Sequence, residues 1–502
     1  MRLPRVIVAL LAGVALALSA AGPASAIRGG TEAARPYSFA GSLQRPESPR
    51  ADGHVCGVTL IAPRWALTAG HCARNPSGAQ VGTPRNWTVR IGSLDVRSGG
   101  QVARVEKFYS YSSRPVADGD IALLRLDRPI AAVPAALPRT RPAAHTVARI
   151  IGWGVTCDEP QPQCYPTRLR EADTRFQATE LCDPSGIVKE RELCVGSPDG
   201  KVAATNMDSG GPALVRSARG WIIAGTVSGS NGDDQPVVYT DVSYFRKWIT
   251  GIVSGSDVPA DSPVPDLEGA VTVNGCSASV VRTASSAPTD PALLLTNGHC
   301  LEQRPVPGGA VVDQPDDQIV RIGDHQGYPQ DSARTTRLLY ATMTGTDVAL
   351  YRLDKSYAQL RAKIFLLGTK PAAAGDRIEI ISAGEGNRYS CTVDTVVAHL
   401  REDGYQQDDA YRYDPACDPG HGSSGSPLVL ADGTTVVGVH STGNDSGERC
   451  TENNPCEVAA DGTVRVEQGR RYGQRTTTLP ACLTVGSRLD LSAPGCGLTP
   501  PA

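Results

Sequence analysis

Short apolar runs separated by turn-forming residues make up most of this chain. Beyond residue 26, runs of Val, Ile, Leu and Ala last only a few positions before Gly, Pro, Asp or Asn interrupts them, which is typical of the strands of β-barrels. From Tyr244 to Ile252 the apolar residues instead recur at the spacing of one face of a helix. The pattern therefore predicts an all-β fold, with a terminal helix that packs on the first half of the chain.

The first 26 residues have the layout of a secretory signal peptide. Arg2 and Arg5 provide the positive start, residues 6–21 form an apolar core, and Ala24-Ser25-Ala26 is a small-residue cleavage site. A membrane anchor is the alternative, but the apolar run is short and ends in Gly22-Pro23. We therefore expect a secreted, extracellular chain that has no membrane association once the signal peptide is removed.

The chain contains an internal repeat with a separation of roughly 230 residues. Four segments recur in the same order, residues 68–72 as 296–300, 89–92 as 320–323, 120–127 as 347–354, and 209–212 as 424–427. This period is too long for a solenoid and indicates a duplicated domain.

A length of 502 residues also favours two domains over a single core. The proline-rich stretch between the two copies predicts an extended, semi-rigid spacer. We predict a signal peptide (1–26), a first domain (27–255), a linker (256–266), a second domain (267–480) and a disulfide-stapled C-terminal tail (481–502).

Composition and charge narrow the classes of partner. The chain has 53 Gly and 38 Pro, and 40% of its residues are hydrophobic, which suits a soluble, turn-rich β protein. Its net charge is -3, and loss of residues 1–26 makes it more negative. Such a balance provides no electrostatic surface for nucleic acid or for an anionic membrane.

Fourteen cysteines in an exported chain indicate disulfides. Sequence order favours seven local pairs, Cys56–Cys72, Cys157–Cys164, Cys182–Cys194, Cys276–Cys300, Cys391–Cys417, Cys450–Cys456 and Cys482–Cys496. Zinc sites are the alternative, but the close pairs lack the Cys and His companions that such sites use. We therefore predict neither a metal nor a cofactor.

His71, Asp120 and Ser209 occur in one of the orders known for a serine catalytic triad. A serine hydroxyl is a weak nucleophile at neutral pH, so it needs a base, and the base needs a buried carboxylate to hold its tautomer. We predict His71 as the base, Asp120 as the orienting carboxylate and Ser209 as the nucleophile.

The sequence around these residues resembles the chymotrypsin/trypsin family. The similar segments are residues 56–72 with their disulfide, 120–124, 152–154, 208–212, 227–228 and 238–240. The resemblance covers about residues 27–253. It implies two six-stranded antiparallel Greek-key barrels in each domain, with the triad in the cleft between them.

The family also gives a meaning to the segment Ile27-Arg28-Gly29-Gly30, which directly follows the predicted cleavage site. In the family, the new terminal ammonium inserts and pairs with the aspartate before the nucleophile, which is Asp208 here. A buried carboxylate needs such a partner. We therefore predict that signal peptidase itself creates the active end at Ile27.

The first domain departs from the family in its oxyanion loop. The backbone N–H groups of Met207 and Ser209 correspond to the two donors, but the family has glycine where Met207 stands. Either Met207 adopts a glycine-like conformation at a cost of about 1–3 kcal/mol, or the peptide flips and one donor is lost, which lowers the rate by roughly 10²–10³.

The substrate pocket of the first domain also departs from the family. The framing disulfide is missing, because Thr205 replaces one cysteine and none follows Ser228 in this domain. Ala203 stands at the position of the pocket base, six residues before the nucleophile. This argues against a preference for Arg or Lys substrates.

The second copy carries His299, Asp347 and Ser424 in the same order. Residues 420–427 resemble bacterial trypsin-like and glutamyl-endopeptidase-like proteins, and the resemblance covers about residues 267–480. Gly422 and Ser424 provide the expected oxyanion donors. Ser423 replaces the carboxylate of the activation pair, which suits a domain whose start is tied to a linker.

The specificity of the second domain stays open. His440 lies where glutamyl endopeptidases carry a pocket histidine, whereas Asp418 lies where trypsin-like members bind Arg or Lys. Equally good interpretations are that His440 is an ordinary strand residue and that Asp418 belongs to a loop turn.

Together the two copies predict a serine endopeptidase that acts on protein or peptide substrates through an acyl-enzyme. The alternative is a binding protein on a protease scaffold, with the first site or both sites silent. A third hypothesis, in which one domain inhibits the other, has no support in the sequence.

Overall fold

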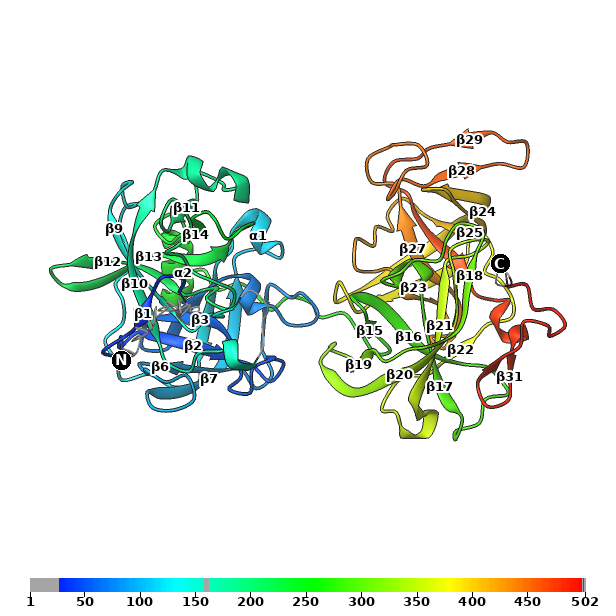
Figure 1. The fold of residues 1–502 in the computed structure, drawn as a ribbon, viewed down its shortest axis with the longest axis horizontal. Coiled ribbons are helices and arrows are strands. Elements are labelled where there is room, and N and C mark those ends of the chain that lie inside the picture. Colours follow the sequence, from blue (N-terminus) through cyan, green and yellow to red (C-terminus); the bar gives the residue numbers. More distant parts are fainter. Residues whose placement is uncertain (1–26, 158–161, 499, 501–502) are drawn as a thin grey trace, which may run out of the picture. The chain divides into compact units, whose positions relative to one another are not determined.

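Strands form most of the regular structure of this protein (Figure 1). The structure is a computed structural model, which describes residues 27–157, 162–498 and 500. It divides into two compact units, here called the first and second domains. The first comprises the chain up to Ala73 with Val81–Ala260, and the second comprises Arg74–Gln80 and Asp261–Ala502. The predicted signal peptide lies outside the described residues.

The first barrel of the first domain is an antiparallel ring in which β7 pairs with β8 to close the sheet. Its strands are β2 (Ala40–Gln44), β3 (His54–Ala62), β4 (Trp65–Thr68), β6 (Thr88–Ile91), β7 (Gln101–Ser110) and β8 (Ala122–Leu126), with β5 (Val81–Gly82) added on β7. Buried Leu, Val and Ile side chains on these short strands fill the interior.

The second barrel of this domain closes through the pairing of β9 with β10. Its strands are β9 (Val147–Gly152), β10 (Arg170–Gln177), β11 (Glu192–Val195), β12 (Pro212–Ser217), β13 (Gly220–Gly229) and β14 (Val237–Asp241), with β1 (Thr31–Glu32) added on β10. The predicted paired six-stranded barrels are therefore confirmed for this domain.

The second domain repeats this architecture. Its first ring closes between β15 and β16, and consists of β15 (Val271–Val273), β16 (Cys276–Arg282), β17 (Pro291–Thr296), β19 (Ile319–Gly323), β20 (Pro329–Thr342) and β21 (Val348–Ser356). Its second ring closes between β27 and β30, and consists of β23 (Arg377–Ser382), β24 (Asn387–Glu402), β25 (Tyr405–Tyr413), β26 (Pro427–Leu430), β27 (Thr435–Gly443) and β30 (Arg471–Arg475).

Several short strands supplement the rings of the second domain. They are β18 (Ala310–Pro315) beside β20, β22 (Phe365–Leu367) between β16 and β27, β28 (Cys456–Val458) beside β24, and β29 (Val464–Arg465) beside β28. Because β22 pairs in parallel with a strand of each ring, it joins the two barrels of this domain.

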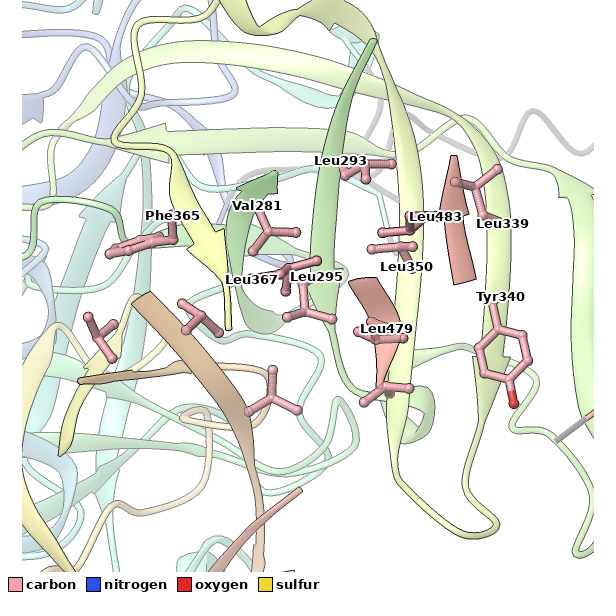
Figure 2. Close-up of a cluster of buried hydrophobic side chains, with 14 of the residues drawn as sticks. Val281, Leu293, Leu295, Leu339, Tyr340, Leu350, Phe365, Leu367, Leu479 and Leu483 are labelled. Atoms are coloured by element: carbon pink, nitrogen blue, oxygen red, sulfur yellow. The ribbon is translucent and has the colours of Figure 1, made fainter. Parts of the chain in front are cut away.

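The C-terminal tail packs into the core of the second domain. Leu483 and Leu498 belong to the same buried cluster as Leu293, Leu350 and Phe365, as the close-up in Figure 2 shows for the residues it labels. The hairpin of β31 (Leu483–Thr484) and β32 (Arg488–Leu489) follows the 3-10 helix η6 (Leu479–Cys482). The tail is thus held by apolar packing as well as by its disulfide.

The predicted terminal helix is present as α2 (Arg246–Ser254). Its buried residues Ile249 and Ile252 lie one turn apart, and Gly255 ends the helix in a left-handed conformation. The helix begins later than its apolar pattern predicts, and Tyr244 before it is exposed. The short helix α1 (Pro115–Asp118) lies before β8. In the described ranges, no helix is both long and apolar enough to cross a bilayer.

Seven disulfides link the described cysteines. They are Cys56–Cys72, Cys157–Cys164, Cys182–Cys194, Cys276–Cys300, Cys391–Cys417, Cys450–Cys456 and Cys482–Cys496. These are the pairs that sequence order favours, and each closes a local loop.

Candidate active sites

Strand register brings the predicted base and carboxylate of the first domain together. Thr68 at the end of β4 pairs with Ala122 at the start of β8. His71 follows Thr68 by three residues in the 3-10 helix η1 (His71–Ala73), and Asp120 precedes Ala122 by two. The backbone N–H of His71 donates to Asp120 Oδ1 at 2.9 Å, and its ring Nδ1 lies 2.8 Å from Oδ2.

Asp120 is fully buried and multiply hydrogen-bonded. The hydroxyl of Ser228 on β13 donates to its Oδ2 at 2.7 Å, in addition to the two bonds from His71. Burial by itself raises the pKa of Asp120, but the hydrogen bonds and charge of these partners bring it below the ordinary value. The carboxylate therefore stays ionised and holds the ring through Nδ1, which leaves Nε2 free to accept a proton.

Glycines let the loop of Ser209 approach the first barrel. Gly210 has a φ of +74°, and a Cβ there would lie 2.1 Å from Thr68 Oγ1 and 2.8 Å from Ala69 N. The backbone N–H of Gly57 donates to the Ser209 carbonyl at 2.8 Å. These contacts place Ser209 beside the segment that leads into His71. Within the described residues the Ser209 hydroxyl makes no hydrogen bond to the ring, and in free enzymes this bond often forms only with substrate.

The oxyanion loop of the first domain adopts the glycine-like alternative. Met207 has a φ of +70°. The carbonyl of Asn206 accepts from Val155 N–H at 2.7 Å, so the peptide before Met207 is not flipped. Among the described residues, the N–H groups of Met207 and Ser209 have no hydrogen-bond partner, which leaves two donors for a developing negative charge.

A residue that the sequence prediction missed supports this loop. The ring of His54, fully buried on β3, bonds to the Met207 carbonyl. Its position two residues before Cys56 was the available signal, but an isolated histidine in a strand gave no reason to connect it with a loop 153 residues away.

The predicted activation pair lies together in the second barrel. Ile27 is buried, and a hydrogen bond from its backbone N–H reaches Asp208. Asp208 also accepts from Gly154 N at 2.7 Å and from Thr205 N at 2.9 Å. A Cβ on Gly152 would lie 1.9 Å from Asp208 Oδ1, so this carboxylate requires glycine there. Burial nonetheless raises the pKa of Asp208 to about 6.

The second domain builds its histidine–aspartate pair by the same register. Thr296 pairs with Ala349. As in the first domain, the histidine, His299, lies three residues after one partner, and the aspartate, Asp347, lies two residues before the other. His299, in the 3-10 helix η4 (Gly298–Cys300), donates its backbone N–H to Asp347 Oδ1 at 3.0 Å, and its Nδ1 lies 2.6 Å from Oδ2. The Ser441 hydroxyl donates to Asp347 Oδ2 at 2.7 Å.

Electrostatics in this pair favour a protonated ring. Burial lowers the pKa of His299, but the charge and hydrogen bond of Asp347 outweigh it, and the net pKa is above the ordinary value. Asp347 has its own pKa lowered below the ordinary value, since the bonds and charge of His299 and the Ser441 hydroxyl outweigh burial. The ring is therefore a stronger base than a free histidine.

Ser424 lies in one cavity with His299 and Asp347. Its carbonyl accepts from Ser277 N–H at 2.9 Å, and a Cβ on Gly425 would lie 2.1 Å from Thr296 Oγ1, as in the first copy. The Ser424 hydroxyl makes a long 3.4 Å contact to the Ser441 carbonyl. Across the described part of the chain, no hydrogen bond joins this hydroxyl to His299.

The oxyanion loop of the second domain matches that of the first. Gly422 has a φ of +99°, and within the described ranges the N–H groups of Gly422 and Ser424 lack partners. The Gly422 carbonyl accepts from the Ser277 hydroxyl at 2.9 Å, where the first domain uses His54. Ser423, which replaces Asp208, is buried and donates its hydroxyl to the Gly420 carbonyl. The half-buried carboxylate of Glu385 also holds this loop, since its Oε1 accepts from Gly420 N–H at 3.1 Å.

The four predicted pocket residues have different surroundings. Ala203 is fully buried and donates its N–H to the Arg28 carbonyl at 3.2 Å. Ser228 donates its hydroxyl to Asp120, so its side chain serves the carboxylate. His440 lines the cavity that contains Ser424, and Asp418 is bound to Arg471.

Two clusters of Cys and His could be mistaken for metal sites. They are Cys56, His71 and Cys72, and Cys276, His299 and Cys300. In both clusters the sulfurs are joined to each other as disulfides, whereas metal ligation by cysteine uses the thiolate.

Comparison with known proteins places both halves in one family. Residues 27–249 match the trypsin family, and residues 276–439 match the trypsin-like peptidase domain. Snake venom serine protease Haly-2 of Gloydius brevicauda is 32% identical over 214 residues, which cover 41% of this chain and 80% of that protein. The chain belongs to the trypsin-like serine protease family. It carries two trypsin-like domains in tandem.

Two further relatives are much longer than the segment they share with these trypsin-like domains. Transmembrane protease serine 9 of Rattus norvegicus is 31% identical over 263 residues, covering 48% of this chain and 24% of that protein. Transmembrane protease serine 11C of Mus musculus is 32% identical over 218 residues, covering 39% and 47%. The chain thus spans less than half the length of either relative.

Proposed function

We propose that both domains are serine endopeptidases that hydrolyse peptide bonds of protein or peptide substrates through an acyl-enzyme. The observation that carries the proposal is a duplicated arrangement. In each copy a buried aspartate accepts bonds from a histidine backbone N–H, from the ring Nδ1 and from a serine hydroxyl. In each copy the described residues leave two backbone N–H groups of the nucleophile loop without partners.

The chemistry follows from these groups. In the first domain, His71 Nε2 takes the proton of the Ser209 hydroxyl as Oγ bonds to the substrate carbonyl carbon, and the oxyanion accepts from the N–H groups of Met207 and Ser209. The ring then protonates the amine as the C–N bond breaks. Water, deprotonated by the same ring, releases the acid and regenerates the serine. In the second domain His299, Ser424 and Gly422 take these parts.

We also propose that the protein is secreted. Seven disulfides suit an oxidising compartment, and the sequence of residues 1–26 predicts a signal peptide. Secretion would allow cleavage before Ile27, which lies against Asp208.

The alternative function is binding on a protease scaffold with one or both sites silent. The observation in its favour is that the described residues contain no hydrogen bond between either serine hydroxyl and its histidine ring. A fluorophosphonate probe, which reacts only with an activated serine, distinguishes the two. We expect label on both Ser209 and Ser424, and loss of each label in Ser209→Ala and Ser424→Ala. Absence of label from the unmodified protein would favour the binding function.

A further inference from the structure

Arg471, which stands in no recognisable motif, lies in the wall of the cavity that contains Ser424. It begins β30 and pairs with Gly443 on β27, two residues beyond Ser441. The guanidinium packs closely on Gly443, since a Cβ there would lie 2.2 Å from Arg471 Nη1. The side chain is 16% exposed and lines the same cavity as Ser424 and His299.

Two carboxylates fix the guanidinium in place. Arg471 Nε donates to Asp418 Oδ1 at 2.8 Å, and Nη1 donates to Asp445 Oδ1. The second oxygen of Asp445 lies 2.9 Å from His421 Nε2. Asp418, the predicted partner of a basic substrate, is thus already bound to a cation of this chain. An arginine held at two of its nitrogens is preorganised and loses little freedom on binding a third acceptor.

The remaining edge of Arg471 is available to a ligand. In the described part of the chain, Nη2 makes no hydrogen bond. A guanidinium has five N–H donors and no acceptor. The described contacts use only two of the five, and the others belong to a group that lines the cavity. The chemistry that fits them is a carboxylate, which accepts two parallel bonds from one guanidinium edge.

His440 adds a second donor to the same cavity. It is buried, and burial lowers its pKa to about 3, so the ring is neutral. Its Nδ1 lies 3.4 Å from the hydroxyl of Tyr413, which is buried and stays protonated because burial raises its pKa. Because the described surroundings give that hydroxyl no other acceptor, it donates to Nδ1. The proton of the neutral ring is then on Nε2, which makes Nε2 a donor.

Two other charged groups that line the cavity, Arg304 and Glu402, have partners of their own. Arg304 pairs with Glu452 at 3.0 Å. Glu402 accepts from Asn453 N–H at 2.7 Å, and burial raises its pKa to about 7. Arg471 is also paired, with two carboxylates, but it keeps unused donors.

The first domain provides an internal comparison. Val227 and His440 occupy equivalent positions, since their carbonyls accept from the glycine after each predicted nucleophile. Val227 pairs with Tyr239 and His440 pairs with Gly473. Two positions before these partners, Tyr239 and Gly473, the first domain has Val237 and the second has Arg471. At this position the first domain thus has an apolar side chain, whereas the second domain has a cation.

From these contacts we propose that Arg471 makes the second domain selective for substrates with an acidic side chain next to the cleaved bond. The inference rests on the proposed peptidase function for its biological meaning, but the binding selectivity can be measured without catalysis. The acidic side chain accepts from Arg471 Nη2, with His440 Nε2 as the second donor. A lysine or arginine side chain brings only donors and cannot accept from Arg471 or His440.

The test uses the full chain with Ser209→Ala and Ser424→Ala, so that no peptide is cleaved. Equilibrium binding is measured for three tetrapeptide amides that differ only in the last residue, Glu, Gln or Lys. We expect the Glu peptide to bind about 10- to 100-fold more tightly than the Gln peptide, the range of one charge-assisted bond. Arg471→Gln, which shortens the side chain and removes its charge, should remove this difference. Asp418→Asn should keep it.

The outcomes separate this inference from the proposed function. Equal binding of the Glu and Gln peptides, tighter binding of the Lys peptide, or a Glu preference that survives Arg471→Gln would overturn the role of Arg471. If Arg471→Gln does not fold, Arg471→Met, which has neither charge nor donors, carries the test, and an undiminished preference there overturns the role too. Fluorophosphonate labelling of Ser424 in the Ser209→Ala chain reports catalysis alone, so a protein that binds the Glu peptide but takes no label contradicts only the peptidase function.

Discussion

The ring of His54 donates a hydrogen bond from Nε2 to the backbone carbonyl of Met207, at 3.1 Å. A carbonyl only accepts, so Nε2 carries the proton. Burial, assisted by the charge of Arg50, lowers the pKa of His54 to about 3, which keeps the ring neutral. Nδ1 is therefore an acceptor, and the Ser42 hydroxyl donates to it at 2.7 Å. Two hydrogen bonds, from Ser42 to His54 and from His54 to Met207, thus connect the first barrel to the oxyanion loop.

Removal of this support should weaken the first site alone. In His54→Ala the Met207 carbonyl loses its partner, and we expect labelling of Ser209 to slow by about 10- to 100-fold, less than the loss of a whole oxyanion donor. Labelling of Ser424 in the same molecule is the control. The matched variant Ser277→Ala removes the bond to the Gly422 carbonyl and should slow only Ser424. Unchanged labelling of Ser209 in His54→Ala would contradict the role given to this bond.

The same histidine predicts that the first domain is sensitive to acid. Its pKa is about 3 when folded and near 6.5 when unfolded. Between these values the unfolded chain binds more protons, so stability is lost as the pH falls below about 6.5 toward 3. His54→Gln, which does not titrate, should flatten this decline in the melting transition of the first domain. An equally steep decline in that variant would exclude His54 as its cause.

Met207 allows a test of backbone strain in the oxyanion loop. A left-handed φ of +70° costs a non-glycine residue on the order of 1 kcal/mol, and more for a β-branched one. Met207→Gly removes the strain but adds freedom to the unfolded chain, so we expect a stability change within about 1 kcal/mol and undiminished labelling of Ser209. Met207→Val should destabilise by about 1–2 kcal/mol. Greater stability of Met207→Val than of the unmodified chain, by thermal unfolding, would show that the loop is unstrained.

The sequence predicted the folds and the histidine–aspartate pairs through the order of the triad residues and the resemblance of their segments to a known family, and strand register explains why each pair meets. Thr68 of β4 pairs with Ala122 of β8. His71 lies three residues after Thr68 and Asp120 two residues before Ala122, so the pairing brings them together. That relation is local to two strands and repeats in the second copy. The disulfides are predictable for a similar reason, since each closes a loop of at most 26 residues.

The residues that the sequence did not predict act across long separations. His54 meets Met207 only because two barrels pack together, and Arg471 reaches its cavity only because β30 pairs with β27. Neither residue stands in a recognisable motif. The sequence also left the conformation of Met207 open, since the choice depends on the bond between Asn206 and Val155.

The pairing of Ile27 with Asp208 predicts that the first site depends on the N-terminus of the mature chain. Burial raises the pKa of Asp208 to about 6, and a terminal ammonium at Ile27 would stabilise its charged form. We expect the secreted protein to begin at Ile27, as N-terminal sequencing would show. A chain with one extra residue before Ile27 should label Ser209 at least about tenfold more slowly. Ser424 should label equally in both chains, because Ser423 has no charge to pair. A mature start elsewhere would rule out the activation pair.

The raised pKa of His299 predicts a pH profile for the second site. The ring must be neutral to accept the Ser424 proton, and the nearby charges of Asp347 and Glu402 stabilise its protonated form. In Ser209→Ala protein, the labelling rate should therefore rise with pH along a limb centred above 6.5. Glu402, whose pKa is about 7, becomes charged in this pH range, so Glu402→Gln should move the limb to lower pH. Asp347→Asn should cut the rate by about 10⁴, because the ring then loses its tautomer. A limb below 6.5 in the Ser209→Ala protein, or a limb unmoved by Glu402→Gln, would mean that these carboxylates do not control the base.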